Sequence, residues 1–137
     1  EFVEAENRFE EMLSTARSRG VRKIGSGGYR DVYSGGSVAG DDCVIKISRG
    51  SLVHNEHVIE LWTKCLTETD KTYVAPLVDW SPHGRWIIQK RADGRGNTTH
   101  VGENLHQEGF IVSDLNGTNV GVYNGRSVLL DMGQLVV

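Results

Sequence analysis

The chain has little cysteine, and this scarcity excludes a disulfide framework. Its two cysteines, Cys43 and Cys65, also fit no zinc-binding spacing, so we expect reduced thiols and a reducing compartment. No apolar run approaches the about 20 residues that span a bilayer. The net charge of -3 gives no general attraction to nucleic acid. We therefore expect a cytosolic protein that binds neither membrane nor nucleic acid.

Several chemical signatures are also missing. The chain has no internal repeat, no low-complexity tract and no Gly-x-Ser-x-Gly elbow, so covalent hydrolase chemistry lacks support. His54 and His57 flank Glu56 on an expected helix, but they do not form a His-Glu-x-x-His motif. We interpret these histidines as surface residues rather than zinc ligands.

Periodic apolar residues predict an α+β chain of 137 residues. Residues 2–19 are expected to form a helix that either docks on its own domain or binds a partner. Alternating segments predict five strands with one helix at 51–66, for which Ser51 is a candidate N-cap. A connector, a helix at 98–107 and a hairpin through Asn124-Gly125 follow. The expected strands are 21–24, 29–33, 43–47, 73–80 and 85–90, and those of the hairpin are 120–123 and 127–130.

A glycine-rich segment lies between the first two expected strands. A phosphate loop of the Walker type would lead into a helix and carry a Lys, and neither is expected here. A hairpin of this kind can instead lay its backbone N–H groups over phosphates, although an ordinary turn would have the same composition. The segment reads Gly25-Ser26-Gly27-Gly28-Tyr29-Arg30-Asp31-Val32-Tyr33.

Lys46 lies inside an apolar strand, where two interpretations are open. Its side chain either faces solvent, as alternation allows, or is buried and requires a partner. In the second case it would contact the phosphates and pair with a carboxylate of the following helix. Glu56 is the first candidate, and Glu60 lies one helical turn later.

Two acidic motifs follow near the C-terminal end. Asp114 and Asn119 are five residues apart, and Asp131-Met132-Gly133 comes twelve residues after Asn119. Turns are rich in Asp, Asn and Gly, which would explain the first motif alone. A turn does not predict the second motif behind an apolar strand.

In this order the four motifs resemble the protein-kinase-like superfamily over residues 21 to 133. Within it the chain is most similar to the minimal effector kinases that bacterial pathogens secrete into host cells. The resemblance implies a single domain of 1–137, with an N-terminal helix at 1–20, an N-lobe at 21–92 and a reduced C-lobe at 93–137. The N-lobe would be a five-stranded antiparallel sheet with one helix.

The resemblance also implies roles for individual residues. Asp114 would accept the proton of the substrate hydroxyl, Lys46 would contact the phosphates, and Asn119 and Asp131 would hold Mg²⁺. These assignments make Asp114, Lys46 and Asn119 the catalytic set. The ATP-binding set would be Gly25, Ser26, Gly27, Gly28, Val32, Lys46, Glu56 and Gln89.

The implied function is an ATP- and Mg²⁺-dependent protein Ser/Thr kinase that acts as a monomer on a host protein in the host cytosol. Known activities in the resembled group include phosphorylation of a heat-shock chaperone and engagement of ubiquitin-conjugating enzymes. One alternative is a pseudokinase that binds nucleotide and docks a partner without turnover. Another is a small-molecule kinase similar to the aminoglycoside group.

Four positions depart from the family pattern. Arg30 replaces the third glycine, where it would stiffen the loop or add charge near phosphate. Val112-Ser113 replaces His-Arg, so activation should not need phosphorylation. Asn116 stands where Lys is usual, and Met132 replaces Phe. No activation segment follows within this sequence, so we expect either that another surface docks the substrate or that the sequence is a piece of a longer protein.

Overall fold

The protein is described by a computed structural model that covers residues 10–11, 14, 21–26 and 30–136. Most of the helix expected at 2–19 lies outside this part of the chain, although Glu10, Glu11 and Ser14 are helical. The chain divides into two compact units, which are described separately below. The first contains Glu1–Ile59 and Leu77–Lys90, and the second contains Glu60–Pro76 and Arg91–Val137.

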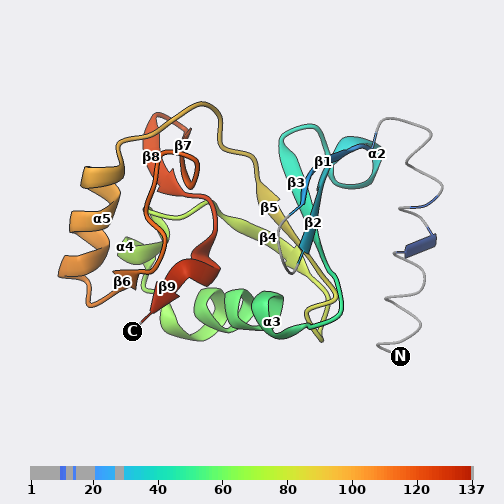
Figure 1. Cartoon of the computed structure of the whole chain (residues 1–137), viewed down its shortest axis with the longest axis horizontal. Helices are drawn as coiled ribbons and strands as arrows, with labels where there is room; N and C mark the ends of the chain where they lie inside the picture. The colour runs from blue at the N-terminus through green and yellow to red at the C-terminus, as the bar shows by residue number, and fades with distance from the viewer. Residues whose placement is uncertain (1–9, 12–13, 15–20, 27–29, 137) are drawn as a thin grey trace. The chain divides into compact units, whose positions relative to one another are not determined.

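The first unit is built on a five-stranded antiparallel sheet, which confirms the expected α+β class (Figure 1). The strand order is β1-β2-β3-β5-β4. The strands lie close to their predicted ranges. The largest difference is in the fourth strand, which begins four residues later than predicted. The strands are β1 (Lys23–Ser26), β2 (Arg30–Ser34), β3 (Cys43–Ser48), β4 (Leu77–Trp80) and β5 (Trp86–Lys90).

One face of this sheet forms an apolar core. Tyr33, Ile45 and Ile88 lie directly opposite one another on β2, β3 and β5, so their side chains share a face. The short helix α2 (Gly36–Ala39) contributes Val38 and Ala39 to the same cluster. The sequence predicted only a turn here, and the contact with the sheet explains why one helical turn forms instead.

The helix predicted at 51–66 is divided into two segments. The α-helix α3 (Val53–Glu60) is followed by a π-helical segment, η2 (Leu61–Cys65). Ser51 lies one residue before the N-cap position, and its hydroxyl accepts a hydrogen bond from the Val53 N–H at 3.3 Å. The predicted helix is therefore present, and its expected cap is displaced by one residue.

Two helices of the second unit begin at capped N-termini. The helix α5 (Thr98–Gln107) has the predicted bounds, and the Asn97 side chain accepts a hydrogen bond from the His100 N–H at 3.0 Å. The short helix α4 (Glu68–Lys71) was not predicted. Thr67 and Asp70 cap it reciprocally, each side chain accepting from the backbone N–H of the other.

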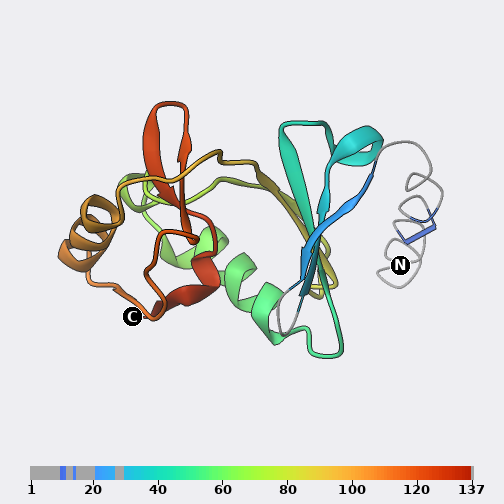
Figure 2. The same ribbon diagram turned by 45° about the horizontal axis from the view of Figure 1, so that its top comes forward.

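The remaining strands of the second unit form two small ribbons. The hairpin of β7 (Val120–Tyr123) and β8 (Arg126–Leu129) confirms the Asn-Gly turn, since Asn124 and Gly125 have φ of 50° and 76°. Its tip extends away from the short helix η3 (Met132–Gln134) (Figure 2). A second ribbon pairs β6 (Ile111–Val112) with β9 (Leu135–Val136). Buried residues of this unit include Val101, Leu105, Val120, Val128, Leu129, Met132 and Leu135.

In the described ranges, no helix combines the length and the apolar character needed to cross a membrane. This finding agrees with the absence of a long apolar run in the sequence.

Candidate functional site

Lys46 is buried on the sheet face opposite the apolar core. Its side chain is 7% exposed, so the interpretation that it faces solvent is wrong. Val32 and Ile87 lie directly opposite Lys46 on the two neighbouring strands, and therefore share its face. An ammonium group is rarely buried in a protein unless it is paired, so the burial marks Lys46 as a residue with a specific role.

Gln89 belongs to the same face. It pairs with Val44, which is two residues from Lys46 on β3, and its side chain is 1% exposed. Three residues of the predicted nucleotide set, Val32, Lys46 and Gln89, are thus brought onto one face of the sheet by strand register. Buried polar groups require hydrogen-bonding partners, so Lys46 and Gln89 need polar partners on a face that also carries Val32 and Ile87.

The glycine segment is described only at its ends. Gly25 and Ser26 belong to β1, whereas Gly27 and Gly28 lie outside the described residues. The Ser26 hydroxyl donates to an Asp31 carboxylate oxygen at 2.8 Å, across the ladder that joins the two ends of the loop. This hydrogen bond, together with nearby Lys23 and Arg49, lowers the pKa of Asp31 despite opposing desolvation. The sequence analysis did not identify Asp31.

Arg30 and Asn55 connect three elements of the first unit. The Arg30 guanidinium donates to the Asn55 side-chain oxygen at 3.2 Å, and the Asn55 amide donates to the Lys46 carbonyl oxygen at 3.1 Å. Arg30 is 8% exposed and Asn55 is fully buried. The contact supports the stiffening role considered for Arg30, because it ties the strand after the glycine segment to α3 and β3.

The acidic residues expected to pair with Lys46 are both exposed. Glu56 lies on α3 beside Gly84, where an added Cβ would come within 2.8 Å of the Glu56 Cγ. Glu60 is the first residue of the second unit. The pairing of Lys46 with either residue stays a prediction.

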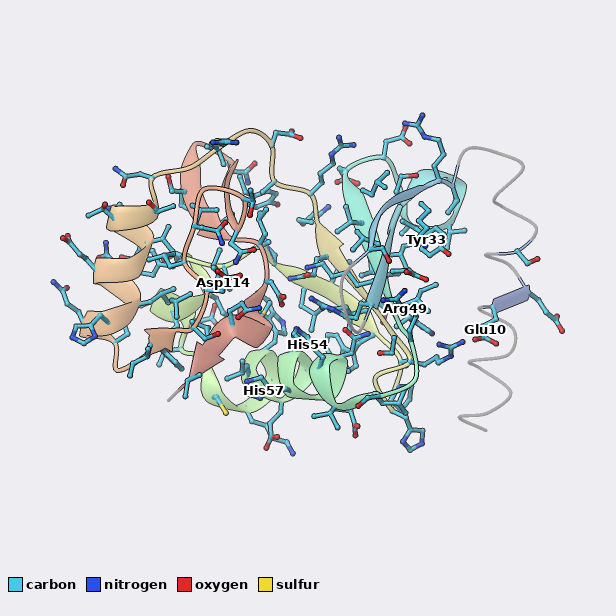
Figure 3. All side chains as sticks on the ribbon, in the orientation of Figure 1. Glu10, Tyr33, Arg49, His54, His57 and Asp114 are labelled. Atoms are coloured by element: carbon cyan, nitrogen blue, oxygen red, sulfur yellow. The ribbon has the colours of Figure 1, made fainter. Side chains whose placement is uncertain are left out.

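In the second unit, the loop after β6 carries Asp114 (Figure 3). Asp114 is exposed, and one of its carboxylate oxygens accepts a hydrogen bond from the Asn116 side-chain amide at 2.8 Å. Its main-chain carbonyl accepts a second hydrogen bond, from the Asn119 side-chain amide. The predicted catalytic Asp and the predicted metal-binding Asn are therefore in direct contact.

The third predicted residue, Asp131, is joined to this loop through the backbone. The Leu130 N–H donates to the Asn119 carbonyl at 2.7 Å, which places Asp131 one residue from the Asn119 contact. Asp131 caps η3 and accepts from the Gly133 N–H at 3.0 Å. Asn119 thus contacts the main chain of Asp114 through its side chain and the residue before Asp131 through its backbone.

The donor set suits a magnesium ion that is shared with phosphate. The Asn119 amide nitrogen is used by the Asp114 carbonyl, so the amide oxygen is the atom available to a cation. Mg²⁺ prefers such oxygens, retains several waters and needs one or two protein ligands beside phosphate. The described residues contain no cluster of three or more His, Cys, Asp or Glu side chains suited to a metal.

The sequence matches no model of a known protein family, and no curated protein matches it. Arguments about function therefore rest on the residues and on their geometry.

Proposed function

We propose that the chain is an ATP- and Mg²⁺-dependent protein Ser/Thr kinase with a minimal kinase-like fold. The proposal is carried by the hydrogen-bonded arrangement of Asp114, Asn119 and Asp131 in the second unit. It is supported by the burial of Lys46 beside Val32 and Gln89 on one sheet face of the first unit. The convergence of these two sets on one triphosphate is part of the proposal.

The chemistry assigned to these residues is an in-line transfer. The oxygen of a Ser or Thr hydroxyl bonds to the γ-phosphorus of ATP, and the bond from that phosphorus to the β–γ bridging oxygen breaks. Asp114 accepts the hydroxyl proton, and ADP leaves with the electron pair. Lys46 balances charge on the α- and β-phosphates. Bound Mg²⁺ would supply further charge neutralisation, with Asn119 and Asp131 as its protein ligands.

The proposed substrate is a protein of a host cell, with a heat-shock chaperone as one candidate, and the proposed site of action is the host cytosol. These assignments rest on the resemblance to secreted effector kinases. The enzyme would act as a monomer.

Transfer of labelled phosphate from ATP to proteins of a eukaryotic lysate tests the proposal. Asp114→Asn keeps the shape of the side chain but removes its basicity, so we expect transfer to fall by about 10²–10⁴-fold. Asp131→Ala should abolish transfer, together with the Mg²⁺-dependent part of the thermal shift caused by ATP. Asp93→Asn is the matched control, because Asp93 is exposed and its carboxylate is ion-paired with Arg91.

Unchanged transfer in the Asp131 variant would remove the metal assignment. A thermal shift with ATP and Mg²⁺ in a parent protein that transfers no phosphate would instead identify a nucleotide-binding pseudokinase. Phosphorylation of an aminoglycoside in place of any lysate protein would point to a small-molecule kinase.

A further inference from the structure

Asn116 is at the centre of the loop that carries Asp114. Its side-chain oxygen accepts hydrogen bonds from the Thr118 backbone N–H at 2.9 Å and from the Thr118 hydroxyl. Its side-chain nitrogen donates to Asp114 Oδ1 at 2.8 Å. The opposite amide orientation would set two N–H donors against each other and an oxygen against a carboxylate, so the network fixes which atom faces Asp114.

The backbone of the same loop is also closed. The Asn119 N–H donates to the Asn116 carbonyl at 3.0 Å, while the Asn119 side chain donates to the Asp114 carbonyl. One amide side chain therefore holds the main chain of Asp114, and another holds its carboxylate. A carboxylate without such a donor rotates over a broad range about its last torsion.

We propose that Asn116 is a positioning residue for Asp114. By holding Oδ1, it directs Oδ2 toward the hydroxyl of the incoming Ser or Thr. Oδ2 accepts no hydrogen bond from the part of the chain that the structure describes. The role rests on the kinase activity proposed above, and it adds to that activity the residue that orients the proton acceptor.

The positioning role gives Asn116 a function that differs from that of the Lys usual at this position. A Lys at 116 would bring a positive charge, whereas Asn116 brings a neutral donor together with an acceptor that fastens it to Thr118. The loop gains a fixed orientation for Asp114 without a cation. We infer that charge on the γ-phosphate is not balanced from this position.

Two substitutions separate positioning from a purely structural role. Asn and Asp both accept hydrogen bonds from the backbone two residues on, so Asn116→Asp keeps the turn to Thr118. The same change replaces the N–H donor to Asp114 by a carboxylate oxygen that repels it, so the neutral Asn116→Ala is read beside it. Asn116→Ala removes both contacts. A positioning role predicts that kcat falls in both variants, by about 10–100-fold for a misplaced reacting group, while KM for ATP stays unchanged.

Thr118→Val is the matched control. It removes the hydroxyl contact but keeps the backbone N–H that holds the Asn116 oxygen. We expect a change in kcat of less than about 3-fold, since the orientation of the amide is preserved. Retention of the parent kcat by Asn116→Asp would overturn the inference, as would a rise in KM for ATP at constant kcat.

The test distinguishes this inference from the proposed function. Full activity of Asp114→Asn would overturn the kinase assignment itself, whereas an inactive Asp114→Asn beside a fully active Asn116→Asp would overturn only the role of Asn116. A second measurement needs no activity. The side-chain amide signal of Asn116 in a ¹H–¹⁵N spectrum should move in Asp114→Ala and stay in place in Asp93→Ala. A signal that does not move in Asp114→Ala refutes the contact.

Discussion

Replacing Asn55 by Ala tests whether the buried link between Arg30 and Lys46 stabilises the first unit. Asn55 accepts one hydrogen bond from the charged Arg30 and donates another to the Lys46 carbonyl. A hydrogen bond to a charged group contributes about 1.5–3 kcal/mol, and a neutral one about 0.5–1.5 kcal/mol. Their sum predicts a loss of about 2–4.5 kcal/mol in the free energy of unfolding.

Urea unfolding followed by circular dichroism measures this loss. With a slope of about 2 kcal/mol per molar urea, the midpoint should fall by about 1–2 M. Asn55→Asp should also lower the free energy of unfolding, because it keeps an acceptor for Arg30 but sets a carboxylate oxygen against the Lys46 carbonyl.

The control is Asp41→Asn, an exposed position of the same unit, which should change the free energy of unfolding by less than about 0.5 kcal/mol. If Asn55→Ala matched this control, the link would not be a stabilising element, and the reasoning from burial would be refuted.

Three further predictions concern other parts of the chain. A hydrogen bond to the Asp70 carboxyl raises the pKa of Glu108, so the stability that this pair contributes is present at low pH and is lost as pH rises through the raised pKa. Glu108→Gln should flatten that decline in melting temperature as pH rises above the ordinary range of a Glu carboxyl. The pKa of Asp31 is lowered, so the stability that its carboxylate contributes is present above the ordinary pKa and is lost as pH falls through the lowered pKa. Ser26→Ala should reduce this contribution to stability, which a series of melting temperatures at different pH values would show. Met132 is fully buried, and Met132→Ala should cost about 2–5 kcal/mol in urea unfolding.

Local signals explain which parts of the fold the sequence predicts well. Alternating apolar residues locate the sheet, and Asn124-Gly125 locates the hairpin, because each signal acts within a few residues. The helices α2 and α4 are too short to have a period, and α2 depends on packing against the sheet. The ribbon of β6 and β9 joins two-residue strands that are distant in sequence, so no local pattern marks it.

The candidate site also contains some features with a local sequence signal and others without one. The order and spacing of the motifs predicted a site of Asp114, Asn119 and Asp131, and the backbone contacts of Asn119 with Asp114 and of Leu130 with Asn119 are compatible with that prediction. The alternation of apolar residues did not decide whether the Lys46 side chain is buried or exposed, because β3 has buried residues on both of its faces. The contact between Asn55 and Arg30 has no local sequence signal, because 25 residues separate the two.

Asn116 was interpreted only as a missing cation. The sequence places it two residues after Asp114, but a contact between their side chains depends on the backbone path of the loop. Its acceptor contact with Thr118, which settles the direction of the amide, is equally invisible before the loop is folded.

The hairpin of β7 and β8 sets the spacing between the two candidate metal ligands. The ladder runs from Val120 and Leu129 directly into the bond between the Asn119 carbonyl and the Leu130 N–H. Extra residues at the Asn124-Gly125 tip would lengthen the hairpin without altering its base, so this turn is a suitable place to graft an epitope or a fluorophore. A single residue inserted within either strand would shift the ladder by one position and pull Asp131 out of line with Asn119.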